Sequence, residues 1–290
     1  MSNQTQQNKA NKIDSELQIM REYINDLTDY VNDLRERAGD RMLDYFAELR
    51  QFPREVIDEQ RIFYIGDATE MLLPMYLDKL ENLKKSLDEK RNNVSDKQND
   101  LKNKLNALKN NNNNRFVMPI MDIDGKILNL VGYSKEANER YVYGTAKYYR
   151  RRETMYGLEN LPLAYELGYA IVTEGITDAV RLRSLGYKNT FAMCGTHKSE
   201  FIMKQLNRCR YGVLRVPDRD EAGQKAVKRW ECNRHITLNT FVAYKDIDEM
   251  CSASPDNKDW VQAYINECIN WLKQKEHQGL KCACENITMF

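Results

Sequence analysis

The chain has 290 residues, of which 42% are hydrophobic and 30% are charged. This length supports two or three compact units, which excludes the class of small proteins that fold only around disulfides or metals. Its 44 Lys and Arg residues balance 43 Asp and Glu residues, which excludes a uniformly basic nucleic-acid binder. Its uncharged runs fall short of the roughly 18 apolar residues that a membrane-spanning helix needs, so no membrane partner is expected.

The N-terminal residues and the cysteines indicate the compartment in which the protein is expected. Residues 1–12 are rich in Gln and Asn and predict a disordered tail without the apolar core of a secretory signal. We therefore expect a cytoplasmic protein, in the host cytoplasm if a phage encodes it. The seven cysteines lie in the C-terminal half and favour free thiols. Cys282 and Cys284, with Cys268 and His277, match no spacing typical of a metal site.

Residues 13–114 form a predicted helical N-terminal region. Apolar residues recur every three or four positions from Leu17 to Leu34, which is the helical period, and the helix is expected to break near Gly39. Pro53 opens a further short helix, and residues 61–67 read as extended chain. Residues 80–108 have apolar positions seven apart, but the positions four residues after them are mostly Lys or polar. One narrow apolar stripe favours a charged surface helix over a partner-binding coiled coil. A polar linker, Asn110 to Asn114, ends the region.

Residues 115–165 form a predicted basic α+β subdomain. Two apolar runs flank Asp124 and Gly125, which predicts a hairpin. Between Arg140 and Arg152 there are five basic residues, no acidic ones and four tyrosines. Cations and aromatic rings in alternation suit single-stranded nucleic acid, whose phosphates and unstacked bases they contact. The alternative is a solvated surface with buried tyrosines.

Residues 166–262 alternate between strand-like and helix-like stretches, from YAIVTE through ITDAVRLRSLG to ITLNTFVAY. This alternation predicts a parallel sheet flanked by helices, followed by a C-terminal helix and tail over residues 263–290. The expected fold class is therefore α+β and α/β: a helical region, a mixed basic subdomain and a parallel sheet. Ligands of such sheets bind beyond the carboxyl ends of the strands.

Carboxylates follow three of these predicted strands. They are Glu174 and Asp178, then Asp218 and Asp220, then Asp246 and Asp248. Two unpaired carboxylates about 4 Å apart repel each other by roughly 4 kcal/mol at an effective dielectric of 20, so a converging group needs a cation. Oxygen ligands without paired His or Cys residues favour Mg²⁺ or Mn²⁺, whose coordination shell substrate phosphates commonly complete. The alternative is that Asp178 and Asp220 cap helices.

The strings VTEGITD, CGT, VPDRDEAGQKA and KDIDE, in this order, resemble the Toprim domain of DnaG-type bacterial and phage primases. Upstream, RFVMPIMDIDGKI and ERYVYGTAKYYRRRETMYGLENL resemble the basic subdomain of these primases, and a weaker match begins at Tyr45. The resemblance covers about Asp40 to Trp260, with residues 67–114 poorly matched.

The resemblance implies roles for individual residues. Glu174, Asp218 and Asp220 match the catalytic positions, and together with Asp178, Asp246 and Asp248 they match the metal site. The positions implied to bind nucleic acid or nucleotide are Arg115, Arg140, Lys147, Arg150, Arg151, Thr196 and Lys198. This chain has Tyr133 where primases usually have an Arg, and Tyr143 where they usually have an Asn.

The expected function is that of a DNA primase, a nucleotidyltransferase that uses Mg²⁺ or Mn²⁺ to synthesise short RNA primers de novo on single-stranded DNA during replication. Its expected partners are the single-stranded template and NTPs. No zinc ribbon is found in the sequence, so a replicative helicase or a separate template-recognition protein is a further expected partner. The alternatives are a Toprim nuclease or topoisomerase-like enzyme, and a non-catalytic replisome component.

Overall fold

The computed structural model describes residues 42–65, 115–134, 141–143, 154–193, 200–227, 232–240, 242–277 and 284–288, and most positions between 21 and 40. The predictions for residues 1–12 and 80–108 lie outside these ranges. The described residues fall into two compact units. One comprises those within 1–43, 61–119 and 125–150, and the other those within 44–60, 120–124 and 151–290. The predicted domain boundaries remain a prediction.

The first unit contains a helix and a small sheet. The described positions from 21 to 38 are helical, and Leu27, Tyr30 and Val31 on this helix are buried, as the apolar period predicts. The helix ends where predicted, at Gly39, which has a φ of 56° that glycine adopts without strain. Its Thr28 hydroxyl accepts a hydrogen bond of 2.9 Å from the backbone N–H of Ile127, which ties the helix to the sheet.

This first sheet has four strands in the order β1-β2-β3-β4. The strands are β1 (Phe63–Ile65), β2 (Arg115–Met121), β3 (Ile127–Tyr133) and β4 (Tyr141–Tyr143). The turn between β2 and β3 confirms the predicted hairpin: Gly125 has a φ of 74°, and the Asp122 carboxylate accepts a hydrogen bond of 2.9 Å from the N–H of Asp124.

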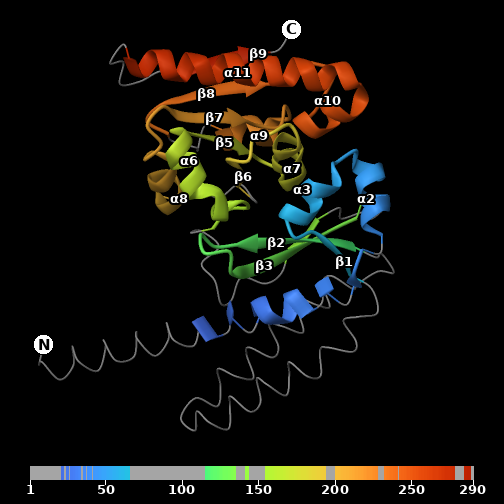
Figure 1. Cartoon of the computed structure of the whole chain (residues 1–290). Helices are drawn as coiled ribbons and strands as arrows, with labels where there is room; N and C mark the ends of the chain where they lie inside the picture. The colour runs from blue at the N-terminus through green and yellow to red at the C-terminus, as the bar shows by residue number, and fades with distance from the viewer. Residues whose placement is uncertain are drawn as a thin grey trace, which may run out of the picture. The chain divides into compact units, whose positions relative to one another are not determined.

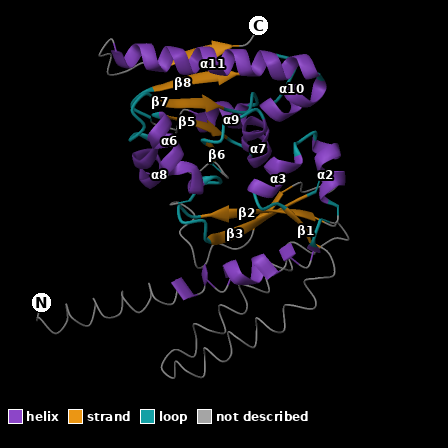
Figure 2. Cartoon of the chain, viewed as in Figure 1, coloured by secondary structure: helices purple, strands orange, loops and turns teal. Residues whose placement is uncertain are grey.

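The second unit is built on a parallel sheet of five strands in the order β6-β5-β7-β8-β9 (Figures 1 and 2). The strands are β5 (Tyr169–Thr173), β6 (Thr190–Ala192), β7 (Gly212–Val216), β8 (His235–Asn239) and β9 (Cys284–Thr288). This confirms the predicted parallel sheet. The edge strand β9 lies in the stretch that was predicted as a tail.

Helices cover both faces of this sheet because side chains alternate along the strands. Ala170 and Val172 of β5 pack with α6 (Leu161–Leu167), α8 (Glu200–Leu206) and α9 (Glu221–Val227). Ile171 of β5 packs on the other face with α7 (Ile176–Ser184), α10 (Ile247–Ala253) and α11 (Pro255–His277). A short 3₁₀ helix, η2 (Leu158–Asn160), precedes α6. Among the described helices, none combines the length and apolar content needed to cross a bilayer.

A segment from early in the chain also belongs to the second unit. It contains most of α2 (Leu43–Arg50) and all of α3 (Arg54–Glu59), which begins after Pro53 as predicted. Gln60 at its end accepts hydrogen bonds from Arg183 and from the Tyr156 hydroxyl, and both of these side chains are buried. Buried polar contacts therefore hold residues 44–60 against α7.

Candidate active site at the carboxyl edge of the parallel sheet

The parallel register brings the predicted acidic strand ends to one edge of the sheet. Thr173 at the end of β5 lies opposite Val216 at the end of β7, and Glu174 and Asp218 follow almost directly. The Thr173 hydroxyl donates a hydrogen bond of 2.9 Å to the carbonyl of Gly175, which fixes the turn from β5 into α7. The strand ends thus place Glu174 beside the loop that carries Asp218 and Asp220.

Glu174, Asp218, Asp220 and Lys245 form one cluster, called here the lysine-bridged group. The Lys245 Nζ atom lies 3.0 Å from Asp218 Oδ2 and 3.3 Å from Asp220 Oδ2. The other oxygen of Asp220 accepts a hydrogen bond of 2.9 Å from the N–H of Gly223 and so caps α9. Asp220 therefore caps α9 with one oxygen, which was the alternative weighed from the sequence, and pairs with Lys245 through the other. Its role as a metal ligand remains a prediction.

Burial and charge change the acidity of this group. Burial, with the charges of Asp218 and Asp220, raises the pKa of Glu174 to about 7. Burial also raises the pKa of Asp218, although Lys245 opposes this. The N–H of Gly223 and the Lys245 ammonium lower the pKa of Asp220. At neutral pH, Glu174 is therefore the member that can gain or lose a proton.

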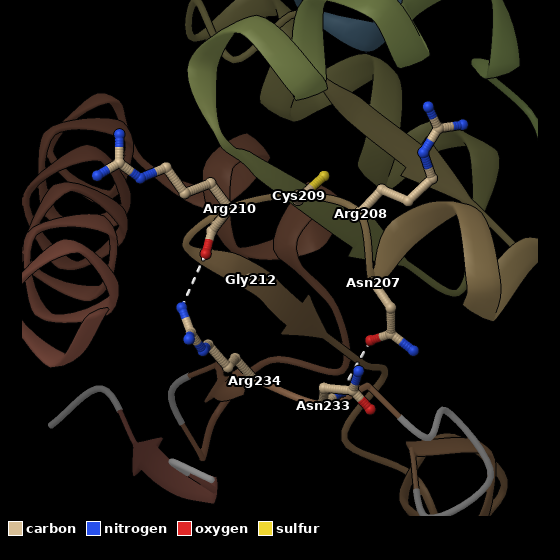
Figure 3. Close-up of a pocket in the computed structure, with 7 residues that line it drawn as sticks. All are labelled: Asn207, Arg208, Cys209, Arg210, Gly212, Asn233 and Arg234. Carbon is tan, nitrogen blue, oxygen red and sulfur yellow. Dashed lines mark hydrogen bonds between the residues drawn. The ribbon is translucent and has the colours of Figure 1, made fainter. Parts of the chain in front are cut away.

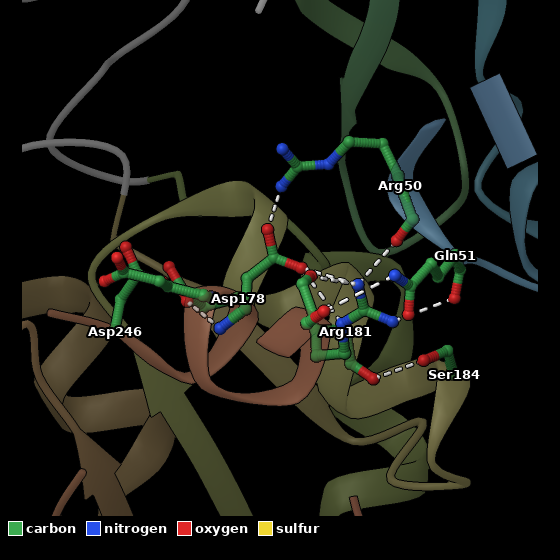
Figure 4. Close-up of polar contacts among 9 residues, drawn as sticks. Arg50, Gln51, Asp178, Arg181, Ser184 and Asp246 are labelled. Carbon is green, nitrogen blue, oxygen red and sulfur yellow. Dashed lines mark hydrogen bonds and ion pairs between the residues drawn. The ribbon is translucent and has the colours of Figure 1, made fainter. Parts of the chain in front are cut away.

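Asp178, Asp248, Arg50 and Arg181 form a second cluster, called here the arginine-bridged group (Figure 4). Arg181 Nε donates a hydrogen bond of 2.9 Å to Asp248 Oδ1, and Arg50 pairs with Asp248 Oδ2. The N–H of Asp248 donates a hydrogen bond of 3.0 Å to Asp178 Oδ1. Both oxygens of Asp248 are therefore held by arginines, and Asp178 is held by the backbone of α10.

Asp246 lies next to this second group. In Figure 4 it is on one side of Asp178, with Arg50 and Arg181 on the other. Its Oδ1 atom accepts a hydrogen bond of 2.7 Å from the N–H of Glu249, so it caps α10. Burial, then the charges of Asp246 and Asp218, raise the pKa of Asp178 well above its ordinary value. Asp178 itself lies in the first turn of α7 and does not cap it, because the N-cap is Gly175.

Glycines let the backbone approach the carboxylates closely. A Cβ atom on Gly223 would lie 2.3 Å from the carbonyl oxygen of Asp218 and 2.9 Å from Glu174 Oε2. A Cβ atom on Gly175 would lie 2.5 Å from Asp178 Oδ2. The contact at Gly223 is with the backbone of Asp218, which cannot rotate away as a side chain can. Only glycine therefore fits at this position of α9 without a shift of the backbone.

The donor set of the lysine-bridged group suits a hard divalent cation, which prefers carboxylate oxygens. Glu174 Oε2 is buried and has no hydrogen-bond partner, as expected for a ligand atom without its metal. Among the described residues, however, no three acidic, His or Cys side chains are arranged to hold an ion. The Lys245 ammonium lies between the two aspartates instead.

The remaining predicted site residues are only partly covered by the structure. Arg115 begins β2. Arg140, Lys147, Arg150, Arg151, Thr196 and Lys198 lie outside the described residues, so their roles remain predictions. Of the Cys and His residues whose spacing matches no metal site, Cys268 lies on α11 and is buried in the apolar core.

A pocket of about 450 Å³ lies away from the predicted site, at the other end of β7 and β8 (Figure 3). None of the predicted site residues lines it. It is lined by Asn207, Arg208, Cys209, Arg210, Gly212, Asn233 and Arg234. In Figure 3 the Arg208 and Arg210 side chains point to opposite sides of the pocket, so the two guanidinium groups do not converge on one ligand group.

Sequence reasoning did not single out the cations of either group. Lys245 directly precedes the Asp246–Asp248 motif, and this adjacency was the available signal. Arg181 is three residues after Asp178, which places both on one side of α7. No local signal pointed to Arg50, because it is separated from Asp248 by 198 positions.

Comparisons with known proteins support the resemblance found in the motifs. Residues 171–263 match the family model described as Toprim-like. The chain is 30% identical to a DNA primase of Aquifex aeolicus over 118 residues, which are 39% of this chain and 24% of the relative. It is 29% identical to a DNA primase of Thermotoga maritima over 145 residues, 47% of this chain and 26% of the relative. The chain thus spans about a quarter of the length of these relatives.

The fold extends the similarity beyond the matched sequence. The structure of a DnaG primase catalytic domain bound to single-stranded DNA is similar over 87% of this chain and 82% of its own, with a TM-score of 0.59 and 17% identity. The chain therefore contains a Toprim-like domain and has the fold of the DnaG catalytic core. The predicted resemblance to DnaG-type primases is confirmed.

Proposed function

We propose that the chain is the catalytic core of a DNA primase, which synthesises short RNA primers on a single-stranded DNA template from NTPs. The observation that carries this proposal is the convergence of Glu174, Asp218 and Asp220 at the carboxyl edge of the sheet. Phosphoryl and nucleotidyl transfer need charge neutralisation and positioning more than covalent help from the protein. A divalent cation bound by carboxylates would meet this need.

In this proposal Glu174, Asp218 and Asp220 hold the divalent cation. Mg²⁺ or Mn²⁺, when bound, neutralises charge on the nucleotide phosphates and favours ionisation of the 3′-hydroxyl. The hydroxyl oxygen attacks the α-phosphorus of the next nucleotide and pyrophosphate leaves. The hydroxyl proton passes to water, because a carboxylate that holds a divalent cation is a weaker base than Glu174 is without metal.

The arginine-bridged group has a supporting role in this proposal. Because both oxygens of Asp248 are paired with arginines, its carboxylate serves to position α10 and the neighbouring Asp246. Asp246 and Asp178 lie close enough to affect the charge of the site. The basic stretch from Arg140 to Arg152 is proposed, from its composition, to bind the phosphates and bases of the template.

Primer synthesis on defined single-stranded templates tests the function. Wild type with Mg²⁺ or Mn²⁺ and NTPs is expected to yield short oligoribonucleotides. Asp218→Asn and Asp220→Asn are expected to lower the yield on the order of 100-fold or more, because each replaces a charged metal ligand. Asparagine at 220 retains the capability to cap α9, so the loss would reflect the charge.

The matched control is Asp256→Asn, which removes one charge from an exposed position in the first turn of α11. It is expected to leave the yield unchanged. Cleavage of the DNA without incorporation of NTPs would favour a Toprim nuclease instead. Full activity in both Asp218→Asn and Asp220→Asn would contradict the proposed site.

A further inference from the structure

The Lys245 ammonium contacts two of the carboxylates that are proposed to hold the metal ion. It contacts one oxygen of Asp218 and one of Asp220, at 3.0 and 3.3 Å. Among the described residues, no other basic side chain forms an ion pair with either aspartate. A cation that binds both carboxylates therefore has to take the place of this ammonium.

The backbone around Lys245 is held firmly. Its carbonyl accepts a hydrogen bond of 2.7 Å from the N–H of Arg219, between the two aspartates, and its own N–H donates one of 2.7 Å to Glu249 Oε2. The Arg219 guanidinium also donates a hydrogen bond of 2.7 Å to the carbonyl of Thr240, within the same loop. The Cα atom of Lys245 is thus fixed relative to the aspartates it contacts.

The side chain of Lys245, in contrast, has room to leave. It is 54% exposed, whereas that of Asp218 is 13% exposed. A lysine side chain has a flexible stem of four carbons and an ammonium group that is strongly hydrated in water. The ammonium can therefore swing into solvent without any movement of the backbone that positions the carboxylates.

One positive charge does not fully satisfy the site. The ammonium contacts Asp218 and Asp220, and Glu174 Oε2 remains buried without a hydrogen-bond partner. A divalent cation carries twice the charge and can accept the remaining oxygen as a ligand. The lysine neutralises part of the charge of the aspartates, whereas a divalent metal ion would neutralise more of it and would also bind Glu174.

We propose that Lys245 is a built-in counter-ion that occupies the cation position between Asp218 and Asp220, and that a divalent metal binds there by displacing it. This inference rests on the proposed function. It identifies Lys245 as the residue that sets the affinity of the proposed metal site. The lysine keeps the carboxylates assembled in the absence of metal. It also weakens metal binding, because each metal ion that enters must first break the two ion pairs.

The test is calorimetric titration of the full chain with MgCl₂ and with MnCl₂. Lys245→Met removes the charge and retains most of the side-chain length. It is expected to bind Mg²⁺ about three- to tenfold more tightly than wild type, since partly exposed ion pairs contribute up to about 1 kcal/mol each. Lys245→Arg retains the charge and is expected to bind with nearly wild-type affinity.

The matched control is Lys225→Met. Lys225 is also exposed and pairs with Glu221 on α9, so the substitution removes the same charge near the site without touching the aspartates. It is expected to change Mg²⁺ affinity less than about twofold, because exposed charges at a distance are screened. An equal gain in Lys225→Met and Lys245→Met would show a general charge effect and overturn the inference.

Thermal unfolding gives a second measurement that does not depend on activity. In EDTA, Lys245→Met is expected to unfold at a lower temperature than wild type, because Asp218 and Asp220 then repel each other without a counter-ion. Saturating Mg²⁺ is expected to close this gap. A purely structural lysine would leave the same gap with and without metal. Lys245→Gln serves as the neutral variant if the methionine variant does not fold.

The outcomes separate this inference from the proposed function. If wild type makes primers but Lys245→Met binds Mg²⁺ no more tightly, the inference is wrong and the function stands. If Lys245→Met binds Mg²⁺ more tightly but no primers form, the function is wrong and the inference stands. If neither protein binds Mg²⁺ or Mn²⁺, both are wrong.

Discussion

The two clusters of carboxylates differ in how they are neutralised. In the lysine-bridged group, one half-exposed ammonium contacts Asp218 and Asp220. In the arginine-bridged group, Arg181 is fully buried, donates to Asp248 and stacks on the ring of Phe52, with its guanidinium carbon 4.5 Å from the ring centre. The first cation can leave through solvent, whereas the second is fixed by packing on all sides.

This difference indicates a division of labour between the clusters. Arg181 also donates hydrogen bonds to the carbonyls of Arg50 and Gln51 and to the Ser252 hydroxyl. It therefore joins the segment from α2 to α3, helix α7 and helix α10. A guanidinium that satisfies this many acceptors cannot exchange with a metal ion without unfolding the region around it. The arginine-bridged group is suited to structure and the lysine-bridged group to binding.

The largest expected effect breaks the arginine-bridged group. Arg181→Met leaves Asp248 with one of its two cations and three backbone or hydroxyl acceptors without a donor. It is expected to lower the free energy of unfolding by about 3 kcal/mol or more, since it removes one cation of a buried ion pair and leaves buried acceptors without a donor. Urea denaturation measures this. Lys245→Met in EDTA is expected to cost only about 1 kcal/mol, because its two ion pairs are partly exposed. Equal costs would contradict the comparison.

An intermediate effect is expected from the two glycines. Gly223→Ala forces a Cβ atom against the backbone carbonyl of Asp218, so it is expected to cost about 1–3 kcal/mol of stability and to weaken Mg²⁺ binding. Gly175→Ala meets the side chain of Asp178, which can shift slightly, so its effect on Mg²⁺ binding is expected to be smaller. Denaturation and calorimetry check both variants. Gln224→Ala, an exposed position on α9, is the control.

The smallest expected effect comes from His235, which belongs to neither cluster. Burial lowers the pKa of His235 below its ordinary value of 6.5. The folded state therefore binds fewer protons than the unfolded state, so this residue destabilises the fold as the pH falls below about 6.5. His235→Gln is expected to reduce the loss of stability between pH 7 and pH 5. Denaturation curves of the two proteins at both pH values measure the difference, which is free of the carboxylate contributions that both proteins share.

Local patterns in the sequence predicted the parallel sheet and the acidic edge. Alternation of strand and helix signals from Tyr169 to Tyr244 predicted seven elements in the correct order, because each buried strand and amphipathic helix has its own period. The edge strand β9 was missed, since its five residues carry no comparable periodic signal. The pairing of β9 with β8 is decided by contact between segments far apart in the chain.

Local patterns also predicted which carboxylates belong to the acidic site, but they did not predict the cation with which each carboxylate pairs. The carboxylates that follow the strands could be identified from the amino-acid sequence, because strand ends and helix caps depend on neighbouring residues. The cation that neutralises each carboxylate is known only from the folded chain. Asp248 is paired with Arg50, 198 positions away, whereas Asp218 and Asp220 are paired with Lys245. Charged side chains pair with the groups nearest to them in space, and which groups are near is decided when the chain folds.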